Sequence, residues 1–298
     1  MDSRVRAPPV GLRTSYRLIA RIFKWLTLAL FAYIAAAFLA HPDWPAVVRA
    51  TLVPRVEWSA TYWATLVGIL GTTISPYLFF WQAAQEVEQD IALGKSIVEQ
   101  REGASNRDLR RSRNDVLTGM FFSNLVMYFI ILTAAATLHA HGKTTISTAR
   151  DAAEALRPLA GDGAYWLFSL GLIGAGMLGV PVLAGSCAYA IAEAADWVGS
   201  LEIHPPLAHG FYGVIAVAMA LGLGLDYAGL NAVKMLFWSA VLNGALAPPL
   251  LILVVLLTSR SDVMGERRNG ALLRWLGWTC AAVMLIATVI MLVTAYAA

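Results

Sequence analysis

Several long stretches of this chain contain no Asp, Glu, Lys or Arg, and they constrain its fold more than any other feature. Among them are residues 58–85, 116–142, 163–192, 203–224 and 235–259. A helix needs about 20 apolar residues to cross a hydrocarbon core of roughly 30 Å, and each stretch is long enough. Charged residues make up only 14% of the chain, whereas about a quarter is typical of soluble domains. The sequence therefore predicts an all-α integral membrane protein.

We expect about seven transmembrane helices in a single membrane domain over residues 1–298. After a cytoplasmic leader over 1–23, the predicted spans are 24–40, 62–84, 116–139, 164–192, 210–225, 233–257 and 272–296. Lys and Arg concentrate in the leader and in the 85–115 and 259–270 loops, and such loops usually stay cytoplasmic. We therefore expect a multi-pass protein of the cell (inner) membrane, with its N-terminus cytoplasmic and its C-terminus outside. The alternative for residues 1–40 is a cleaved signal peptide.

Several other classes of protein are disfavoured. The chain has no phosphate-binding loop, nucleophile elbow or HExxH motif, so we expect neither an enzyme nor a bound cofactor. Its basic residues flank apolar spans and form no run interleaved with aromatic residues, so we expect the lipid bilayer as a partner and no nucleic acid. Cys187 and Cys280 lie inside apolar stretches, where buried thiols are expected in place of a disulfide or a metal site.

Helix breakers and hydroxyl side chains meet in the middle of the second predicted span. The run reads Gly71-Thr72-Thr73-Ile74-Ser75-Pro76-Tyr77. Proline has no N–H group and clashes with the preceding turn, so backbone carbonyls near Thr72 lose their partners. Within a membrane such carbonyls need protein, water or an ion, and broken helices of this kind form substrate sites in many transporters. The alternative is a packing kink in which Thr and Ser hydroxyls bond back to the helix.

The run GTTISPYLFFWQAAQEVE, with RNDVLTGMFFSNLVMYFIILTAAATLH and GVPVLAGSCAYAIAE behind it, resembles the Nramp-related divalent metal ion transporter family. The resemblance extends from about residue 16 to the end and matches the C-terminal portion of that family, lacking its first four helices. It implies a partial LeuT-type inverted-repeat fold, with a metal site at the breaks of the family's first and sixth helices. The second predicted span here corresponds to the sixth helix of the family. A divalent metal ion would then be the substrate and not a cofactor.

The resemblance also implies site residues. It places a carbonyl metal ligand at Thr72 and a side-chain ligand at Ser75, where the family usually has Met. Asn243, one turn from the position of a polar Gln in the family's tenth helix, is a substitute third ligand. The residues that form the helix break and line the pathway are Gly71, Pro76, Tyr77 and Gln82. A serine hydroxyl is a harder ligand than a methionine thioether, which favours Mg²⁺ or Mn²⁺.

One departure from the family pattern affects the functional interpretation. The family's first helix carries an Asp that is its principal charged metal ligand, whereas no predicted span here has Asp or Glu near its centre. We therefore expect half of a secondary transporter for divalent metal ions of the Mn, Mg and Fe class, incomplete in this chain. The missing N-terminal helices would come from a separate chain or a homo-oligomer. Two alternatives stay open: a transporter of the same fold for a small organic solute, and a non-transporting membrane fragment.

Overall fold

The computed structural model of this chain describes residues 31–95, 97, 100, 103–137, 139, 142, 146, 148–201, 203 and 205–297. All regular structure in these ranges is helical, and they contain no strand. The helices that are long and apolar enough to cross a membrane cover Ala60–Ile91, Asn106–Thr137, Tyr165–Ala194, His209–Tyr227, Ala232–Ser259 and Ala271–Tyr296. The prediction of an all-α, multi-pass membrane fold is thereby confirmed.

The first predicted span, residues 24–40, lies outside the described residues up to residue 30, and its remainder contains α2 (Ala32–Leu39). By internal contacts the chain divides into two compact units. One unit contains the described residues up to Thr51 together with Phe80–Gly229, and the other contains Leu52–Phe79 and Leu230–Ala298. The single membrane domain stays a prediction.

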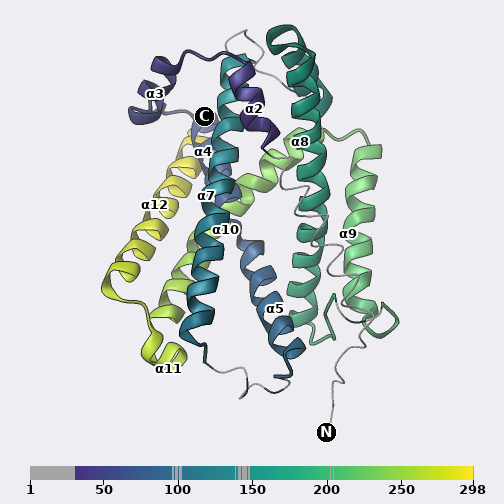
Figure 1. Cartoon of the computed structure of the whole chain (residues 1–298), viewed down its shortest axis with the longest axis vertical. Coiled ribbons are helices and arrows are strands. Elements are labelled where there is room, and N and C mark those ends of the chain that lie inside the picture. The colour runs from purple at the N-terminus through teal and green to yellow at the C-terminus, as the bar shows by residue number, and fades with distance from the viewer. Residues whose placement is uncertain are drawn as a thin grey trace. The chain divides into compact units, whose positions relative to one another are not determined.

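The second unit is built around α4 (Ala60–Thr73). This helix packs against both α10 (Ala232–Ser259) and α12 (Ala271–Tyr296), which also pack against each other (Figure 1). The short α11 (Ser261–Met264) follows α10. The core of this unit is formed by small and apolar side chains from all three long helices, namely Ala64, Val67, Val241, Ala287 and Met291. Small residues in such a core allow membrane helices to approach closely.

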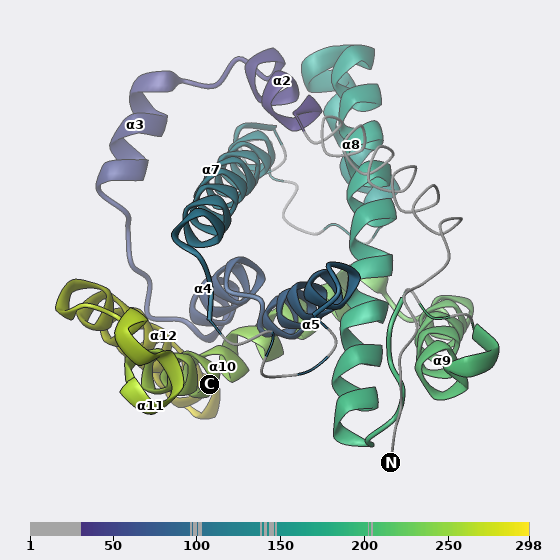
Figure 2. The same ribbon diagram turned by 60° about the horizontal axis from the view of Figure 1, so that its bottom comes forward.

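The first unit contains α2, α3 (Trp44–Leu52), α7 (Asn106–Thr137), α8 (Ala149–Ala194) and α9 (His209–Tyr227), with most of α5 (Pro76–Ala92). Helix α8 packs against α2 and α9, and α2 also packs against α7 (Figure 2). A core cluster joins α8 to α9 and the residue before it, through Ala188, Tyr189, Ala192, Ala208 and Phe211.

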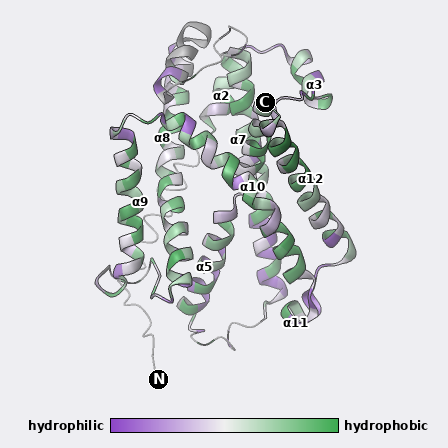
Figure 3. Cartoon of the chain, turned by 180° about the vertical axis from the view of Figure 1, so that it is seen from behind, coloured by the Kyte–Doolittle hydropathy of each residue, from purple (hydrophilic) through white to green (hydrophobic). Residues whose placement is uncertain are grey.

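The surface of the long helices is apolar, as a lipid-facing surface requires. Figure 3 shows hydrophobic colour along most of α12, with hydrophilic residues on α5. Large side chains such as Leu292 on α12 are more than half exposed. Cys187 on α8 and Cys280 on α12 are exposed as well. The expectation of buried thiols is therefore wrong, because an apolar stretch in a membrane helix covers the lipid-facing side as well as the packed side.

Candidate cation site at a broken helix

The helix that covers Ala60–Ile91 is interrupted near its middle. Helix α4 ends at Thr73 and α5 begins at Pro76. Between them Ile74 has φ −105° and ψ 68°, which is not helical, and its N–H donates to the Leu70 carbonyl at 2.8 Å. The N–H of Leu78 donates to the Ser75 carbonyl at 3.0 Å as α5 begins. Because Pro76 has no N–H, the Thr72 carbonyl has no backbone donor four residues ahead.

The hydroxyl groups around the break donate to backbone carbonyls. Ser75 Oγ donates to the Thr72 carbonyl at 2.7 Å and lies 3.3 Å from the Gly71 carbonyl. The Oγ1 atoms of Thr72 and Thr73 donate to the Ile69 carbonyl at 2.8 and 2.9 Å. This is the bonding that a packing kink predicts. It uses the single proton of each hydroxyl, and the hydroxyl oxygens keep lone pairs for another partner.

The residues at the break differ in exposure. Ser75 is only 2% exposed and Pro76 is buried, whereas Tyr77 is half-buried and Thr72 is exposed. A buried hydroxyl with free lone pairs lies beside an exposed residue whose carbonyl is short of a backbone donor. The break therefore presents oxygen atoms from Thr72 and Ser75 within three residues of one another.

Helix α10 meets α4 immediately before the break, at a contact between glycines. A Cβ atom added to Gly71 would lie 2.3 Å from the Gly244 nitrogen and 2.4 Å from the Ala240 carbonyl oxygen. One added to Gly244 would lie 2.2 Å from the Val67 carbonyl oxygen. Asn243 is half-buried in the same turn of α10. This contact brings the turn that carries Asn243 close to the start of the break, within the second unit.

Gln82 belongs to the first unit, where it lines a cavity of about 250 Å³. The cavity is lined by residues from one face of α5, namely Trp81, Gln82, Gln85, Glu86 and Gln89. The second predicted span ended at residue 84, whereas α5 continues to Ala92. Gln85, Glu86 and Gln89 therefore belong to the same helix as Gln82, beyond the end of the predicted span. Their spacing from Gln82 of three, four and seven residues is the helical signal that would have identified them.

Two polar residues of α5 reach α8. Tyr189 is 6% exposed, and its hydroxyl donates to Glu88 Oε1 at 2.7 Å. It accepts from Gln85 Nε2 at 3.3 Å and from the backbone N–H of Leu201 at 3.2 Å. Trp81 packs on the same ring with a centroid separation of 5.8 Å. These contacts fix the rotation of α5 and thereby determine which of its residues line the cavity.

Charged metal ligands do not gather in the part of the chain that the structure describes. There, no group of three or more His, Cys, Asp or Glu side chains is placed to hold a metal ion. The predicted ligands Thr72, Ser75 and Asn243 are all neutral oxygen donors. Hard divalent cations bind six or more oxygen atoms, so these three supply only part of a coordination shell.

Comparison with known proteins identifies the family of this chain. A profile of the family described as natural resistance-associated macrophage protein-like matches residues 9–294. A divalent metal cation transporter MntH from Granulibacter bethesdensis is 23% identical over 95% of this chain and 60% of its own length. The MntH protein of Deinococcus radiodurans is 27% identical over 85% of this chain and 54% of its own length. The MntH protein of Aeromonas hydrophila is 28% identical over 80% of this chain and 53% of its own length. The chain thus spans little more than half the length of these relatives.

Proposed function

Because this chain belongs to the natural resistance-associated macrophage protein-like family, we propose that it forms part of a pathway for divalent metal cations across a membrane. Its curated relatives are named as transporters and not as enzymes. The observation that carries the proposal is the interruption of a membrane helix between Thr73 and Pro76. Such interruptions form substrate sites in secondary transporters, because freed backbone oxygens can coordinate an ion. The cation is the substrate of this chain and not a resident cofactor.

The proposed ligands are the Thr72 carbonyl, the Ser75 hydroxyl and the Asn243 side-chain amide. The hydrogen bonds at the break support the assignment of Ser75. Its hydroxyl donates its proton to the Thr72 carbonyl, so the oxygen lone pairs are available to a cation. All three are hard oxygen donors, which favour Mn²⁺, Mg²⁺ and Fe²⁺ over softer metals. Because three neutral donors do not complete a shell, the proposal assigns the remaining ligands to water and to a second polypeptide. That polypeptide is a separate chain that supplies further helices or a second copy of this one.

The route beyond the site follows the polar face of α5. Polar groups exposed to lipid are costly, so a face with Gln82, Glu86 and Gln89 requires water or protein against it. Thirteen residues of helix between Pro76 and Gln89 rise about 20 Å, enough to lead from the break towards one membrane surface. We assign this face to a hydrated route for the ion. The distribution of Lys and Arg supports an inner-membrane location with a cytoplasmic N-terminus and an external C-terminus.

Uptake of radiolabelled Mn²⁺ into proteoliposomes containing this chain tests the proposal, with Mg²⁺ as competitor. Pro76→Ala combined with Ser75→Ala is the test variant. The matched control is Ser239→Ala on α10, an exposed serine whose hydroxyl donates to the Leu236 carbonyl at 2.9 Å. We expect uptake that the double variant abolishes and the control keeps. Well-folded protein that gives no more uptake than empty liposomes would contradict a working pathway in this chain alone. Uptake that both variants keep would place the pathway elsewhere.

A further inference from the structure

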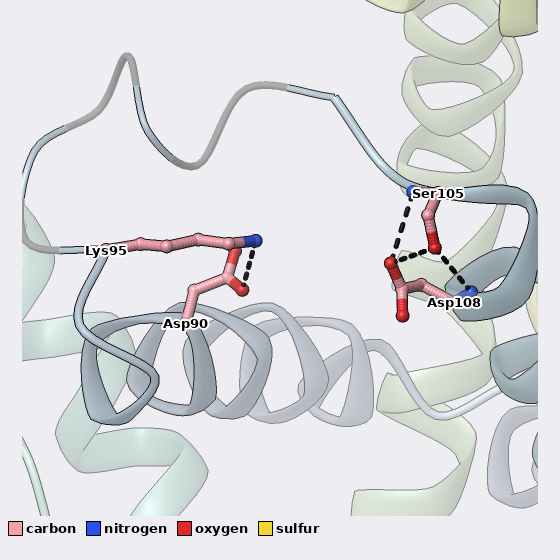
Figure 4. Close-up of polar contacts among 4 residues, drawn as sticks. All are labelled: Asp90, Lys95, Ser105 and Asp108. Carbon is pink, nitrogen blue, oxygen red and sulfur yellow. Dashed lines mark hydrogen bonds and ion pairs between the residues drawn. The ribbon is translucent and has the colours of Figure 1, made fainter.

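The beginning of α7 carries an arginine cluster with no ion pair in the described part of the chain. Its members are Arg107, Arg110, Arg111 and Arg113, and all four are exposed. The described basic residue before them in the same connection, Lys95, is paired with Asp90 at 2.9 Å (Figure 4). Four guanidinium groups within seven residues repel one another unless an anion lies between them. An anion bound beside the cluster would relieve this repulsion.

Asp108, an acidic side chain inside the cluster, belongs to the cap of α7, and Asp115 follows the cluster in the same helix. The Oδ2 atom of Asp108 accepts from the Ser105 backbone N–H at 3.1 Å, and the Asp108 N–H donates to Ser105 Oγ at 3.1 Å (Figure 4). This reciprocal cap fixes the first turn of the helix, as capping boxes do. The arginines therefore stand on an ordered helix, and their four positive charges outnumber the two carboxylates of Asp108 and Asp115.

Two of the arginines share a helical face with exposed apolar residues. Arg110, Arg113, Leu117 and Phe121 follow one another at spacings of three, four and four residues, which places them on one side of a helix. Leu117 is 60% exposed and Phe121 is 63% exposed. Arg113 and Leu117 are separated by one turn, about 6 Å of rise. The face thus changes from cationic to apolar over the distance at which a lipid changes from headgroup to acyl chain.

We propose that this face, made by Arg110, Arg113, Leu117 and Phe121, binds an anionic phospholipid. The two guanidinium groups hold the headgroup phosphate, for which their planar donor geometry is suited. Leu117 and Phe121 contact the acyl chains of the same lipid. A soluble anion would use the arginines but not the apolar residues, and the continuity of the two along one helix therefore favours lipid. Clusters of Arg and Lys directly beside a membrane helix are a known signature of anionic lipid recognition.

The test is lipid binding by the purified full chain in nanodiscs of phosphatidylcholine, titrated with phosphatidylglycerol and read by native mass spectrometry of the released protein. The test variant is Arg110→Gln with Arg113→Gln. The matched control is Arg107→Gln with Arg111→Gln, which removes the same charge at one position about 15 Å along the helix from Leu117 and one about 120° round the helix from it. Each arginine near an anionic membrane surface contributes about fivefold in affinity. We therefore expect the test variant to bind phosphatidylglycerol at least about twentyfold more weakly. The affinity of the control variant for phosphatidylglycerol should fall much less.

Three results would overturn the proposal. Equal losses of phosphatidylglycerol affinity in the two double variants would mean that lipid binding depends on the net charge of the protein and not on this face. Unchanged binding in Arg110→Gln with Arg113→Gln would exclude the two arginines directly. Displacement of the lipid by millimolar glycerophosphoglycerol would show a phosphate site that does not use Leu117 and Phe121. Circular dichroism and gel-filtration profiles of each variant establish that the fold is retained, and none of these readouts depends on transport.

Discussion

The two halves of the broken helix contact their surroundings in opposite ways. Helix α4 is apolar and meets α10 backbone to backbone, through Gly71 and Gly244. Helix α5 begins with apolar aromatic residues but becomes polar from Gln82 onward, and its partner on α8 is the hydroxyl of Tyr189. The first half is held by close packing that tolerates no added atom, and the second half by hydrogen bonds. The break at Ile74 and Ser75 is where one kind of contact gives way to the other.

We infer from this difference that α4 and α5 have different roles in the proposed pathway. Close packing without side chains holds the Thr72 and Gly71 carbonyls in fixed positions, which a coordination site requires. Hydrogen bonds between polar side chains fix the rotation of α5, which determines the side chains that face water. The first two of the following predictions each alter one half, the third alters the break, and the last lies outside both halves.

The largest effect is expected at the glycine contact of α4. In Gly71→Val the new Cβ would meet the backbone of Gly244, which cannot rotate away as a side chain can. Overpacking of this kind usually costs about 1–3 kcal/mol, and we expect the upper end or more. Thermal unfolding in detergent should show a strongly lowered Tm or no folded protein. Gly119→Val on α7 is the control, because a Cβ there meets nothing within 4 Å. Equal Tm values for the two variants would refute the close contact.

The next effect concerns the hydrogen bonds that hold α5. Tyr189→Phe keeps the ring that packs on Trp81 and Phe211 but removes the hydroxyl shared by Glu88, Gln85 and the Leu201 N–H. Leaving buried polar groups without partners costs about 1–3 kcal/mol.

The Tm of Tyr189→Phe should therefore fall by several degrees, measured by intrinsic fluorescence in detergent. Tyr212→Phe is a suitable control, because its hydroxyl donates only to the backbone carbonyls of Leu201 and Ile203 and it is less buried. A larger loss of stability in the control would mean that the network around Tyr189 does not fix α5.

A smaller effect is expected on ion preference. Ser75→Met replaces a hard hydroxyl with a soft thioether next to the Thr72 carbonyl, and soft donors favour softer metals. The ratio of Cd²⁺ to Mg²⁺ uptake, in liposomes that contain this chain and whatever partner it needs, should rise severalfold. The same ratio before and after the substitution would show that Ser75 does not face the ion.

The smallest effect is expected outside both halves, at the exposed pair of Arg260 and Asp262. The hydrogen bond from the guanidinium lowers the pKa of Asp262 below its usual value. A carboxyl with a depressed pKa in the folded state stabilises the fold above its unfolded pKa, and that contribution is lost as the pH falls below about 4. Because the pair is fully exposed, Asp262→Asn should change Tm only slightly at pH 7 and less at pH 3 than at pH 7. A large change at pH 7 would show that this loop contributes more than its exposure indicates.

Much of the fold was predictable because the membrane imposes it. Charge-free stretches of sufficient length correspond to helices from Ala60 onward, and the proline at residue 76 marked the interruption. The end of α5 was not predictable in the same way. The charges of Glu86 and Glu88 ended the predicted span at residue 84, whereas α5 continues to Ala92 and Glu88 accepts a hydrogen bond from the hydroxyl of Tyr189, about 100 residues later. The exposure of Cys187 was misjudged for a related reason, since hydropathy does not distinguish a lipid-facing side chain from a packed one.

The candidate site was predictable only in part. The run from Gly71 to Tyr77 predicted the position of the break. The contact between Gly71 and Gly244, however, joins residues more than 170 positions apart. No local pattern reveals such a contact, because glycine itself carries no side chain that signals a partner. That the hydroxyls bond back to the helix was one of the alternatives for a packing kink, but the residue types did not identify the Thr72 carbonyl as the partner of Ser75.

The central claim is that the oxygen atoms at the break between α4 and α5 bind a divalent cation. Its most direct test is a titration of the purified chain with Mn²⁺, in which electron paramagnetic resonance measures the free ion. The titration is repeated with the variants Ser75→Ala and Asn243→Ala and with the control Ser239→Ala. We predict saturable binding that Mg²⁺ displaces, that the first two variants weaken and that the control keeps. Saturable binding of equal strength in all four proteins would contradict the claim and place the cation away from the break.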